Sequence, residues 1–517
     1  MKQPSFRARA CAVAWGLLIA GGISANTDGM LDTTLNPSLG AFPFYGVPGL
    51  VDYAIDYGGT APTTNDDYAS VVLALPDGRI VVAGRVWSSG SPVSSHVGVV
   101  ERFMPDGSID TTFGTAGRVE IGAPGSVDLY ISSIAQQGDK LLVAAAYRLT
   151  SAPATAYALL TRLDNDGNFD ADLMGGSTDP FPSEGFNKVI TDSAGNIYLT
   201  GYFDHPQGRR LDVIFAGPNA GAGNVYSFNF VIGSGTGDGV IGNDLVLRHM
   251  PGQSCGDGCV IPAHDELLVV GTAYMGAYGD GLPNHDCVVA AFRRNPLVDM
   301  DFHVDAAFNG GQPLVVDFPA GGTTEGDNIC LAAAPRIGSG VVIAGANQFI
   351  STLGGGSPGL ASTYALAEVD ESGAVTRQDA FAFFQEPAMP GIFNAIFALA
   401  REPGGKLVVA GSAGSSNALR APSDAGVIRF NADYSRDATF GNDGAGLAIL
   451  SLDGQGSMAT GQREWATSLA RDNHGRILLA GTRSYDIASS GDYDWLIARL
   501  DNADDVIFRD GFDNAIP

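Results

Sequence analysis

The sequence contains few basic residues and few cysteines, and it lacks the motifs of the common enzyme classes. It has 29 Lys and Arg against 56 Asp and Glu, and the net charge of −27 excludes non-specific nucleic-acid binding through a basic face. There is no H-E-x-x-H, no P-loop and no G-x-S-x-G, and the glycine-rich run at 233–239 lacks the strand and helix that dinucleotide binding requires. The seven histidines lie at unrelated positions and show no ligand spacing. The sequence therefore predicts no catalytic residue.

The N-terminus has the features of an export signal. Lys2, Arg7 and Arg9 precede an apolar stretch at 10–23, and the I-S-A that ends at Ala25 suits a signal peptidase. The stretch has 14 residues, whereas a membrane-spanning helix needs about 20, which disfavours a membrane anchor. We therefore predict a signal peptide over residues 1–25 and a mature chain that is extracellular, at the cell surface or periplasmic.

A short apolar segment that ends in a small residue recurs every 56–74 residues. Its seven copies define units one to seven and end at Gly84, Ala145, Gly201, Gly271, Gly345, Gly411 and Gly481. Another apolar segment and a turn precede each copy, and a second pair of segments follows after a variable loop. Period-two alternation, β-branched residues and frequent Gly and Pro indicate four short strands in each unit. The sequence predicts an all-β fold, a seven-bladed β-propeller of four-stranded blades.

The two ends of the chain have complementary gaps in the repeat. Residues 28–40, DGMLDTTLNPSLG, match the closing segment DGSIDTTFG of unit one, whereas unit seven stops at 495–505 without such a segment. We predict that an N-terminal strand completes the last blade and closes the ring, which removes exposed sheet edges. The alternative is an open solenoid with a stray fragment at its start. The propeller would span 26–505 and be followed by a C-terminal tail, 506–517.

These motifs resemble the delta-60 repeat family, in which a D-G-x-I-V-V-A-G hairpin is followed by an A-R-L/F-x-x-D-G-S-L-D-x-x-F-G hairpin. The resemblance extends from about Asp28 to Asp505 and is close in units one, six and seven, recognisable in unit two and diluted by insertions in units three to five. It implies an exported, bacterial, propeller-like protein of largely uncharacterised function, and it supplies no catalytic residues.

Four cysteines follow the predicted signal peptide, and an even number favours disulfides in an exported chain. Cys255 and Cys259 lie in the link between the first two strands of unit four. Cys287 opens a third strand and Cys330 begins a first strand, both near the opposite face. This placement favours the pairs Cys255–Cys259 and Cys287–Cys330. A four-cysteine zinc site is the alternative, but its usual C-x-x-C pairs are absent.

An acidic residue occurs in each link that leads to an innermost strand. In a closed propeller these carboxylates would surround one mouth of the central channel, and calcium is the cation that would suit them. They are Asp66, Asp67, Asp128, Glu184, Asp238, Glu325, Asp327, Glu386 and Glu464. Ordinary solvated loop charges are the alternative, because acids are frequent in this chain. The sequence itself requires no cofactor.

A small polar residue also occurs near the start of each innermost strand. Symmetry would arrange these residues as a ring that lines the channel: Ser70, Ser132, Asn187, Asn243, Asn328, Asn394 and Thr467. Such a ring could bind a ligand, or its members could hydrogen-bond to neighbouring backbone where larger side chains would not fit. The sequence leaves both alternatives open.

The combined pattern predicts a monomeric binding or interaction module for an unknown protein or glycan, with no nucleic-acid partner and no membrane span. Its contact surface would be the face with the acidic links and the variable loops, whose aromatic residues are Trp87, Tyr274, Tyr278, Phe349 and Tyr485. One alternative is an extracellular hydrolase or lyase that uses Asp66, Asp67, Asp238 and Asp327. Another is a structural exterior protein with no small ligand.

Overall fold

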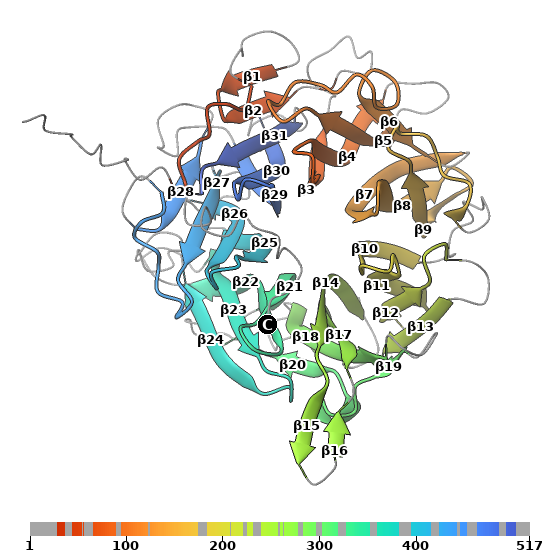
Figure 1. Ribbon diagram of the computed structural model, residues 1–517, viewed down its shortest axis with the longest axis vertical. Coiled ribbons are helices and arrows are strands. Elements are labelled where there is room, and N and C mark those ends of the chain that lie inside the picture. The colour runs from red at the N-terminus through yellow and green to blue at the C-terminus, as the bar shows by residue number, and fades with distance from the viewer. Residues whose placement is uncertain are drawn as a thin grey trace, which may run out of the picture.

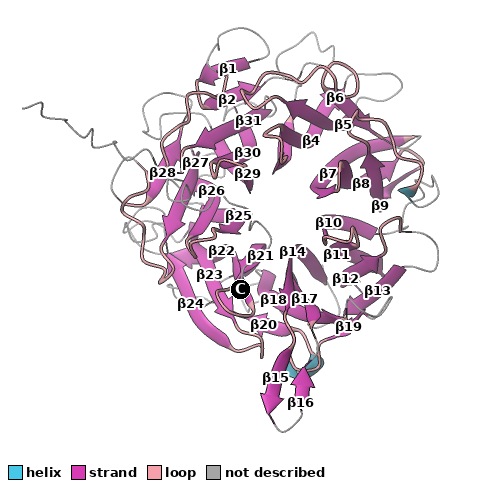
Figure 2. Cartoon of the chain, in the orientation of Figure 1, coloured by secondary structure: helices cyan, strands magenta, loops and turns pink. Residues whose placement is uncertain are grey.

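The computed structural model describes residues 28–502 with several gaps. The gaps are 37–43, 54, 56–65, 89–94, 123–124, 174–183, 207, 221–224, 231–238, 257–258, 262, 278–282, 296–301, 319–326, 352–358, 382–393, 415–422, 442–444, 452–462 and 485–492. Within the described ranges the elements are β-strands apart from short 3-10 segments such as Asn309–Gly311 (Figure 2). None of the helical segments in these ranges has the length and apolar character needed to cross a membrane.

Units one, two, three and five form separate antiparallel sheets whose strands follow chain order. Unit one contains β3 (Tyr68–Ala74), β4 (Ile80–Ser88), β5 (Ser95–Phe103) and β6 (Arg118–Ile121); unit two contains β7 (Ser126–Gln137), β8 (Lys140–Leu149) and β9 (Ala152–Leu163). Unit three contains β10 (Glu184–Thr191), β11 (Ile197–His205), β12 (Gly208–Ala216) and β13 (Val225–Phe230); unit five contains β21 (Asp327–Pro335), β22 (Val341–Ser351), β23 (Gly359–Val369) and β24 (Val375–Phe381). Unit two thus has three strands rather than the expected four within the described residues.

Unit four has a split outer edge and an inserted hairpin. Its strands are β14 (Val240–Met250), β17 (His264–Ala277) and β18 (Pro283–Arg294), and both β19 (Phe302–Val304) and β20 (Leu314–Val316) pair with β18. The inserted hairpin consists of β15 (Gln253–Gly256) and β16 (Cys259–Ile261), and it projects from the ring (Figure 1).

Units six and seven share one sheet, because a single parallel pair joins Ser423 to Arg463. Unit six contains β25 (Asn394–Arg401), β26 (Leu407–Gly414), β27 (Ser423–Phe430) and β28 (Leu447–Leu450). Unit seven contains β29 (Arg463–Arg471), β30 (Ile477–Ser484) and β31 (Tyr493–Leu500), followed on the outside by the N-terminal strands β2 (Leu50–Tyr53) and β1 (Phe44–Val47).

The sheets stand around a common centre, with the first strand of each unit innermost (Figure 1). The hydrophobic core lies between neighbouring sheets. One buried cluster combines Val100 of unit one with Leu159 of unit two, and another combines Val82 of unit one with Leu478 and Trp495 of unit seven. Because the central strands are buried on both faces, their sequences are continuous apolar runs.

The strand directions define two faces of the ring. We call the end where each first strand passes into the second the turn face, and the end where the second strand passes into the third the loop face.

A β-bulge in each first strand explains the small residue that ends each repeat motif. In unit seven the register shifts between Ala466 and Ser468, so Thr467 is the extra residue. Gly481 lies opposite, and a Cβ atom there would lie less than 3.0 Å from the carbonyl oxygen of Trp465. The same close approach occurs at Gly84, Gly201, Gly271, Gly345 and Gly411. The small residue therefore leaves room for the bulged strand.

The N-terminal segment packs on unit seven as the closing segment of unit one packs on its own unit. Strand β2 pairs with β31, with Leu50 opposite Ala498. At the turn face, Asp32 N donates to Arg499 O at 2.8 Å, as Asp110 N donates to Arg102 O at 2.9 Å in unit one. The sequence match between DGMLDTTL and DGSIDTTF thus corresponds to the same backbone contacts.

A buried ion pair between arginine and aspartate repeats at the turn face. The Nε–Oδ2 distances are 2.7 Å for Arg102–Asp110, 2.7 Å for Arg162–Asp170, 2.8 Å for Arg429–Asp437 and 2.7 Å for Arg499–Asp32. Three of these pairs lie within one unit, whereas the fourth joins the two ends of the described chain.

Candidate functional site

The small polar residues at four of the bulges hydrogen-bond to the backbone of the next unit. Ser132 Oγ donates to Phe186 O at 2.5 Å, Asn187 Nδ2 to Gly242 O at 2.9 Å, Asn243 Nδ2 to Cys330 O at 2.7 Å, and Thr467 Oγ1 to Ala69 O at 2.8 Å. In every case the acceptor directly precedes the bulge of the next unit. We call these four residues the bulge belt. Their side chains join neighbouring units through donors that a ligand would otherwise use.

Ser70 is the bulge residue of unit one, whereas the residues predicted for units five and six do not lie at the bulge. There the bulge residues are Leu331 and Phe397, and the predicted Asn328 and Asn394 lie three residues earlier. Asn328 Nδ2 instead donates to Asp317 Oδ1 at 2.8 Å, and Asn394 Nδ2 donates to Ser362 O at 3.1 Å. Bulge positions depend on strand pairing, which a polar residue near a strand start does not specify.

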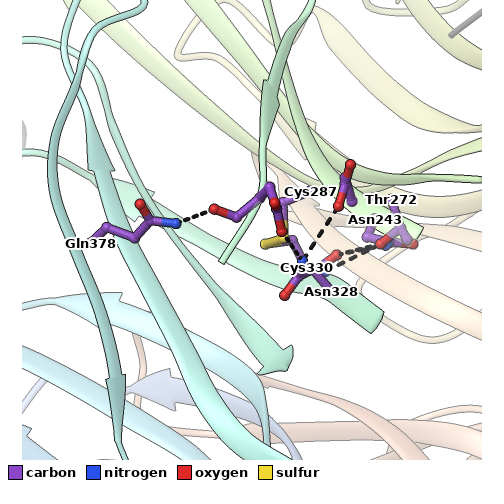
Figure 3. The surroundings of a disulfide bond; sticks show 8 residues. Asn243, Thr272, Cys287, Asn328, Cys330 and Gln378 are labelled. Atoms are coloured by element: carbon purple, nitrogen blue, oxygen red, sulfur yellow. Dashed lines mark hydrogen bonds between the residues drawn. A yellow bond between two sulfur atoms is a disulfide. The ribbon is translucent and has the colours of Figure 1, made fainter. Parts of the chain in front are cut away.

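Cys287 of β18 and Cys330 of β21 form a disulfide that joins units four and five (Figure 3). This confirms the predicted pair. Asn243 Nδ2 and Thr272 Oγ1 both contact Cys330 O, at 2.7 and 3.3 Å, so the disulfide lies beside the bulge belt. The side chains of Cys255 and Cys259 lie outside the described residues, and their pairing stays a prediction.

The predicted acidic ring is only partly covered by the structure. Asp238, Glu325, Glu386 and the side chain of Glu184 lie outside the described residues. Four of the other acids have partners of their own: Asp67 Oδ1 accepts from Trp87 N at 3.0 Å, Asp327 Oδ1 from His285 N at 2.8 Å, Glu464 pairs with Arg483 at 3.4 Å, and Asp128 with His96 at 3.4 Å. The fifth, Asp66, lies near His96 and Arg85. In the part of the chain that is described, no group of three or more His, Cys, Asp or Glu could hold a metal ion. Calcium at this mouth stays a prediction.

One group of aromatic and charged side chains gathers on the loop face where units seven and one meet. We call it the loop-face cluster: Asp66, Tyr68, Arg85, Trp87, His96, Trp465 and Tyr493. It comes from the starts of β3, β5, β29 and β31, from the end of β4 and from Asp66, which precedes β3 and pairs with Tyr493. All seven residues are partly buried.

Ring contacts fix the geometry of the loop-face cluster. Tyr68 and Tyr493 stack with centroids 4.8 Å apart, and the Arg85 guanidinium carbon lies 4.3 Å from the Tyr68 centroid. The Trp87 and His96 rings meet edge to face at 5.1 Å. Such pairs restrict the side chains before any ligand arrives, which lowers the entropy cost of binding.

The charges in the loop-face cluster are partly desolvated. Burial raises the pKa of Asp66, and the nearby His96 and Arg85 partly offset this effect. Burial and then the charge of Arg85 lower the pKa of His96, while Asp128 and Asp66 act in the opposite direction. The net effect favours the neutral form of the imidazole.

Three polar atoms of the loop-face cluster are buried without a hydrogen-bond partner among the described residues. They are Asp66 Oδ1, Arg85 Nε and His96 Nε2. Nearly all buried polar atoms in native proteins are paired, so such a group suits a ligand or water that both donates and accepts hydrogen bonds. The arrangement supports recognition of a polar group beside aromatic surfaces.

Unit four repeats part of the loop-face cluster. Tyr274 lies opposite His285 in the β17–β18 pair, as Trp87 lies opposite His96 in the β4–β5 pair. His285 Nδ1 lies 2.8 Å from Asp327 Oδ1, and Tyr274 and His285 have ring centroids 5.4 Å apart. An aromatic residue, a histidine and an aspartate thus occur together twice on the loop face.

Sequence reasoning found some members of the loop-face cluster and missed others. Asp66 was predicted as a member of the acidic ring and Trp87 as part of the contact surface, whereas Arg85 and Tyr493 were not singled out. The prediction that the histidines occupy unrelated positions is wrong for His96 and His285. His96 lies three residues before Val99, which pairs with Gly84, and His285 lies three residues before Val288, which pairs with Gly271. Counting back from that paired position could have revealed the equivalence.

Comparisons with known proteins support the repeat architecture. A family model described as a domain of unknown function (DUF5122) beta-propeller matches residues 75–113 and 403–440, in units one and six. No curated protein matches the chain. The two matched segments, with the all-β fold, already indicate propeller repeats.

Solved structures resemble the chain only distantly. The β-propeller domain of the Trilobed protease from Pyrococcus furiosus has 7% identity, covers 86% of this chain and 98% of its own, and has a TM-score of 0.38. Chaetomium thermophilum Sqt1, bound to the N-terminus of ribosomal protein L10, has 11% identity, coverages of 84% and 88%, and a TM-score of 0.38. An α-L-arabinanase from Penicillium chrysogenum has 10% identity, coverages of 73% and 94%, and a TM-score of 0.36. These values support no statement about function. The matched segments and the all-β fold support a β-propeller repeat architecture.

Proposed function

We propose that this protein is an exported, seven-bladed β-propeller of the delta-60 type, closed by its N-terminal segment, that acts as an extracellular or cell-surface binding module. Closure is supported by the core cluster shared by units one and seven, by the hydrogen bond from Thr467 to Ala69 O, and by the Arg499–Asp32 ion pair. Export is supported by the sequence of residues 1–25.

The loop-face cluster is the observation that carries the binding function. Its aromatic rings are held by one another, and its unpaired atoms include a donor on Arg85 and an acceptor on Asp66. Aromatic surfaces beside a few fixed polar groups are typical of recognition sites. Catalysis has less support, because the described acids Asp67 and Asp327 each bind a backbone N–H on a different part of the face.

The partner is a protein or a glycan of the cell exterior. The test measures saturable binding of the purified, labelled protein to cell-envelope fragments from the producing organism. The double variant Trp87→Ala/Tyr493→Ala should bind at least about tenfold more weakly, since truncating aromatic anchors commonly costs more than 1 kcal/mol each. Prior periodate or protease treatment of the fragments assigns the partner to glycan or protein.

The matched control is Phe169→Ala, because Phe169 is an exposed aromatic residue near the turn face of unit two. It should bind like the wild-type protein. Thermal unfolding of all variants checks that each remains folded. Undiminished binding by a folded double variant would contradict the proposed function.

A further inference from the structure

A hollow of about 280 Å³ lies at the turn face between units one and two. It is far from the loop-face cluster, since the two faces are opposite ends of the strands. Leu75, Pro76 and Leu141 contribute apolar lining, and Arg79 and Arg102 contribute guanidinium groups. The walls therefore combine C–H surface with fixed polar groups.

The first turn of unit one lacks a side-chain bridge of the kind that two other junctions have. Between units seven and one, Asn473 Nδ2 donates to Pro76 O at 3.1 Å. Between units two and three, Gln137 Nε2 donates to Gly195 O at 2.5 Å and to Pro218 O at 2.9 Å. Pro76 holds in unit one the turn position that Asn473 holds in unit seven, but proline has no side-chain donor that could reach across.

The charges around the hollow favour a neutral ligand. Two cations, Arg79 and Arg102, and two anions, Asp77 and Asp139, line it, and Arg79 is paired with Asp77 at 2.6 Å. Arg102 is also paired with Asp110 at 2.7 Å, so a bound anion or cation would gain little net attraction. Both guanidinium groups already donate to protein acceptors, Arg79 to Asp77, Asp110 and Asn165 and Arg102 to Asp110, Asn165 and Thr112. A ligand with hydroxyl groups can accept from the remaining guanidinium N–H hydrogens and donate to the carboxylates without adding a charge.

The size and walls of the hollow narrow the ligand class further. Its volume lies just below the range of about 300–1,000 Å³ that is usual for drug-sized ligands. Leu75, Pro76 and Leu141 present aliphatic surface to the C–H face of a ring, while the polar groups suit its hydroxyls. We propose that this hollow binds a single neutral hexopyranose unit. The proposal does not depend on the function assigned to the loop face.

The test uses saturation-transfer NMR on the purified protein with methyl glucoside, methyl mannoside and methyl galactoside, each alone. At least one should bind saturably at millimolar concentration. Glucuronate and glucosamine, which carry a charge, should bind at least about tenfold more weakly, which corresponds to about 1.4 kcal/mol. Absence of binding by all three neutral glycosides, or equal binding by the charged sugars, would overturn the proposal.

The decisive variant is Pro76→Asn. The turn accepts asparagine, because unit seven has Asn473 at the same position. Both turns are closed by the same backbone hydrogen bond, from Gly475 N to Asp472 O at 3.0 Å in unit seven and from Gly78 N to Leu75 O at 2.9 Å in unit one. The new amide should fill the hollow and reduce glycoside binding at least tenfold, with an equal or higher Tm. Wild-type binding by this variant would place the ligand elsewhere and refute the assignment.

Two controls separate the hollow from other sites. Asn473→Ala removes the bridge at the neighbouring junction and should leave glycoside binding at least as strong as in the wild type. Trp87→Ala/Tyr493→Ala alters only the loop face and should leave it unchanged. Equal loss in either control would show that the signal does not come from the hollow.

Discussion

Substitution of Asp32 by alanine tests how the two ends of the chain hold together. Asp32 Oδ2 accepts from Arg499 Nε at 2.7 Å and from Arg476 at 2.8 Å, and Oδ1 accepts from Thr34 N and Oγ1. The Arg499 side chain is only 1% exposed. Removing one partner of a buried ion pair leaves an uncompensated charge and typically costs about 3–5 kcal/mol. We expect Asp32→Ala to lower the free energy of unfolding by that amount.

The matched variant is Asp110→Ala, which removes the equivalent contacts to Arg102 and Thr112 inside unit one. Urea denaturation followed by far-ultraviolet circular dichroism should give a similar loss for both. Native-state hydrogen exchange should differ. Only Asp32→Ala should speed exchange in the N-terminal strands β1 and β2, because Asp32 contacts unit seven from that segment, whereas the contacts of Asp110 stay within unit one.

One result would refute this reasoning: Asp32→Ala lowers the free energy of unfolding by less than about 1 kcal/mol, while Asp110→Ala lowers it by the expected amount of about 3–5 kcal/mol. The contacts of Asp32 would then contribute no more than a surface ion pair, and the proposed closure of the ring would lose one of its three supports.

Three further changes test the internal architecture. Gly481→Ala should lower the free energy of unfolding by about 1–3 kcal/mol in urea, because the added Cβ would crowd the bulged strand; a neutral effect would show that this strand shifts freely. Replacing both Cys287 and Cys330 by alanine should lower the free energy of unfolding by about 2–5 kcal/mol, measured by thermal unfolding. A reductant should lower the Tm of the wild-type protein but not that of the double variant. A hydrogen bond from Lys140 lowers the pKa of Asp170 to about 2. Because the pKa of Asp170 is lower in the folded than in the unfolded protein, the ionised carboxylate stabilises the fold above pH 3.8, and this stabilisation is lost as the pH falls through 2. The urea midpoint of the wild type should therefore drop between pH 4 and 2. The drop should be smaller in Asp170→Asn.

The repeat motif predicted the strands because its residue types are dictated by local geometry. The small residue at Gly84 or Gly481 leaves space for a bulged partner strand, and apolar runs mark strands buried on both faces. The match between residues 28–40 and the end of unit one predicted where the N-terminus would pack. Such features recur at fixed distances along the chain, so one sequence reveals them.

The candidate site was harder to predict because it depends on pairing between strands. Trp87 and His96 are separated by a loop of variable length, and only the register places them opposite each other. Asn328 and Asn394 resembled Asn243 in position along the chain, but the bulge falls three residues later in their strands. Loop length hides register, and register decides which side chains meet.

The Arg499–Asp32 pair also has a consequence for the order of folding. Its partners are separated by 467 residues, so this contact forms only after nearly the whole described chain is available. Contacts of such long range slow folding, because the entropy of closing the loop is lost before any contact compensates. Neighbouring units bury shared clusters and can pair earlier, so we expect the junction of the two ends to be the last step. Until that step, β31 has an unpaired edge, and the time spent in that state sets how long the folding protein is exposed to aggregation.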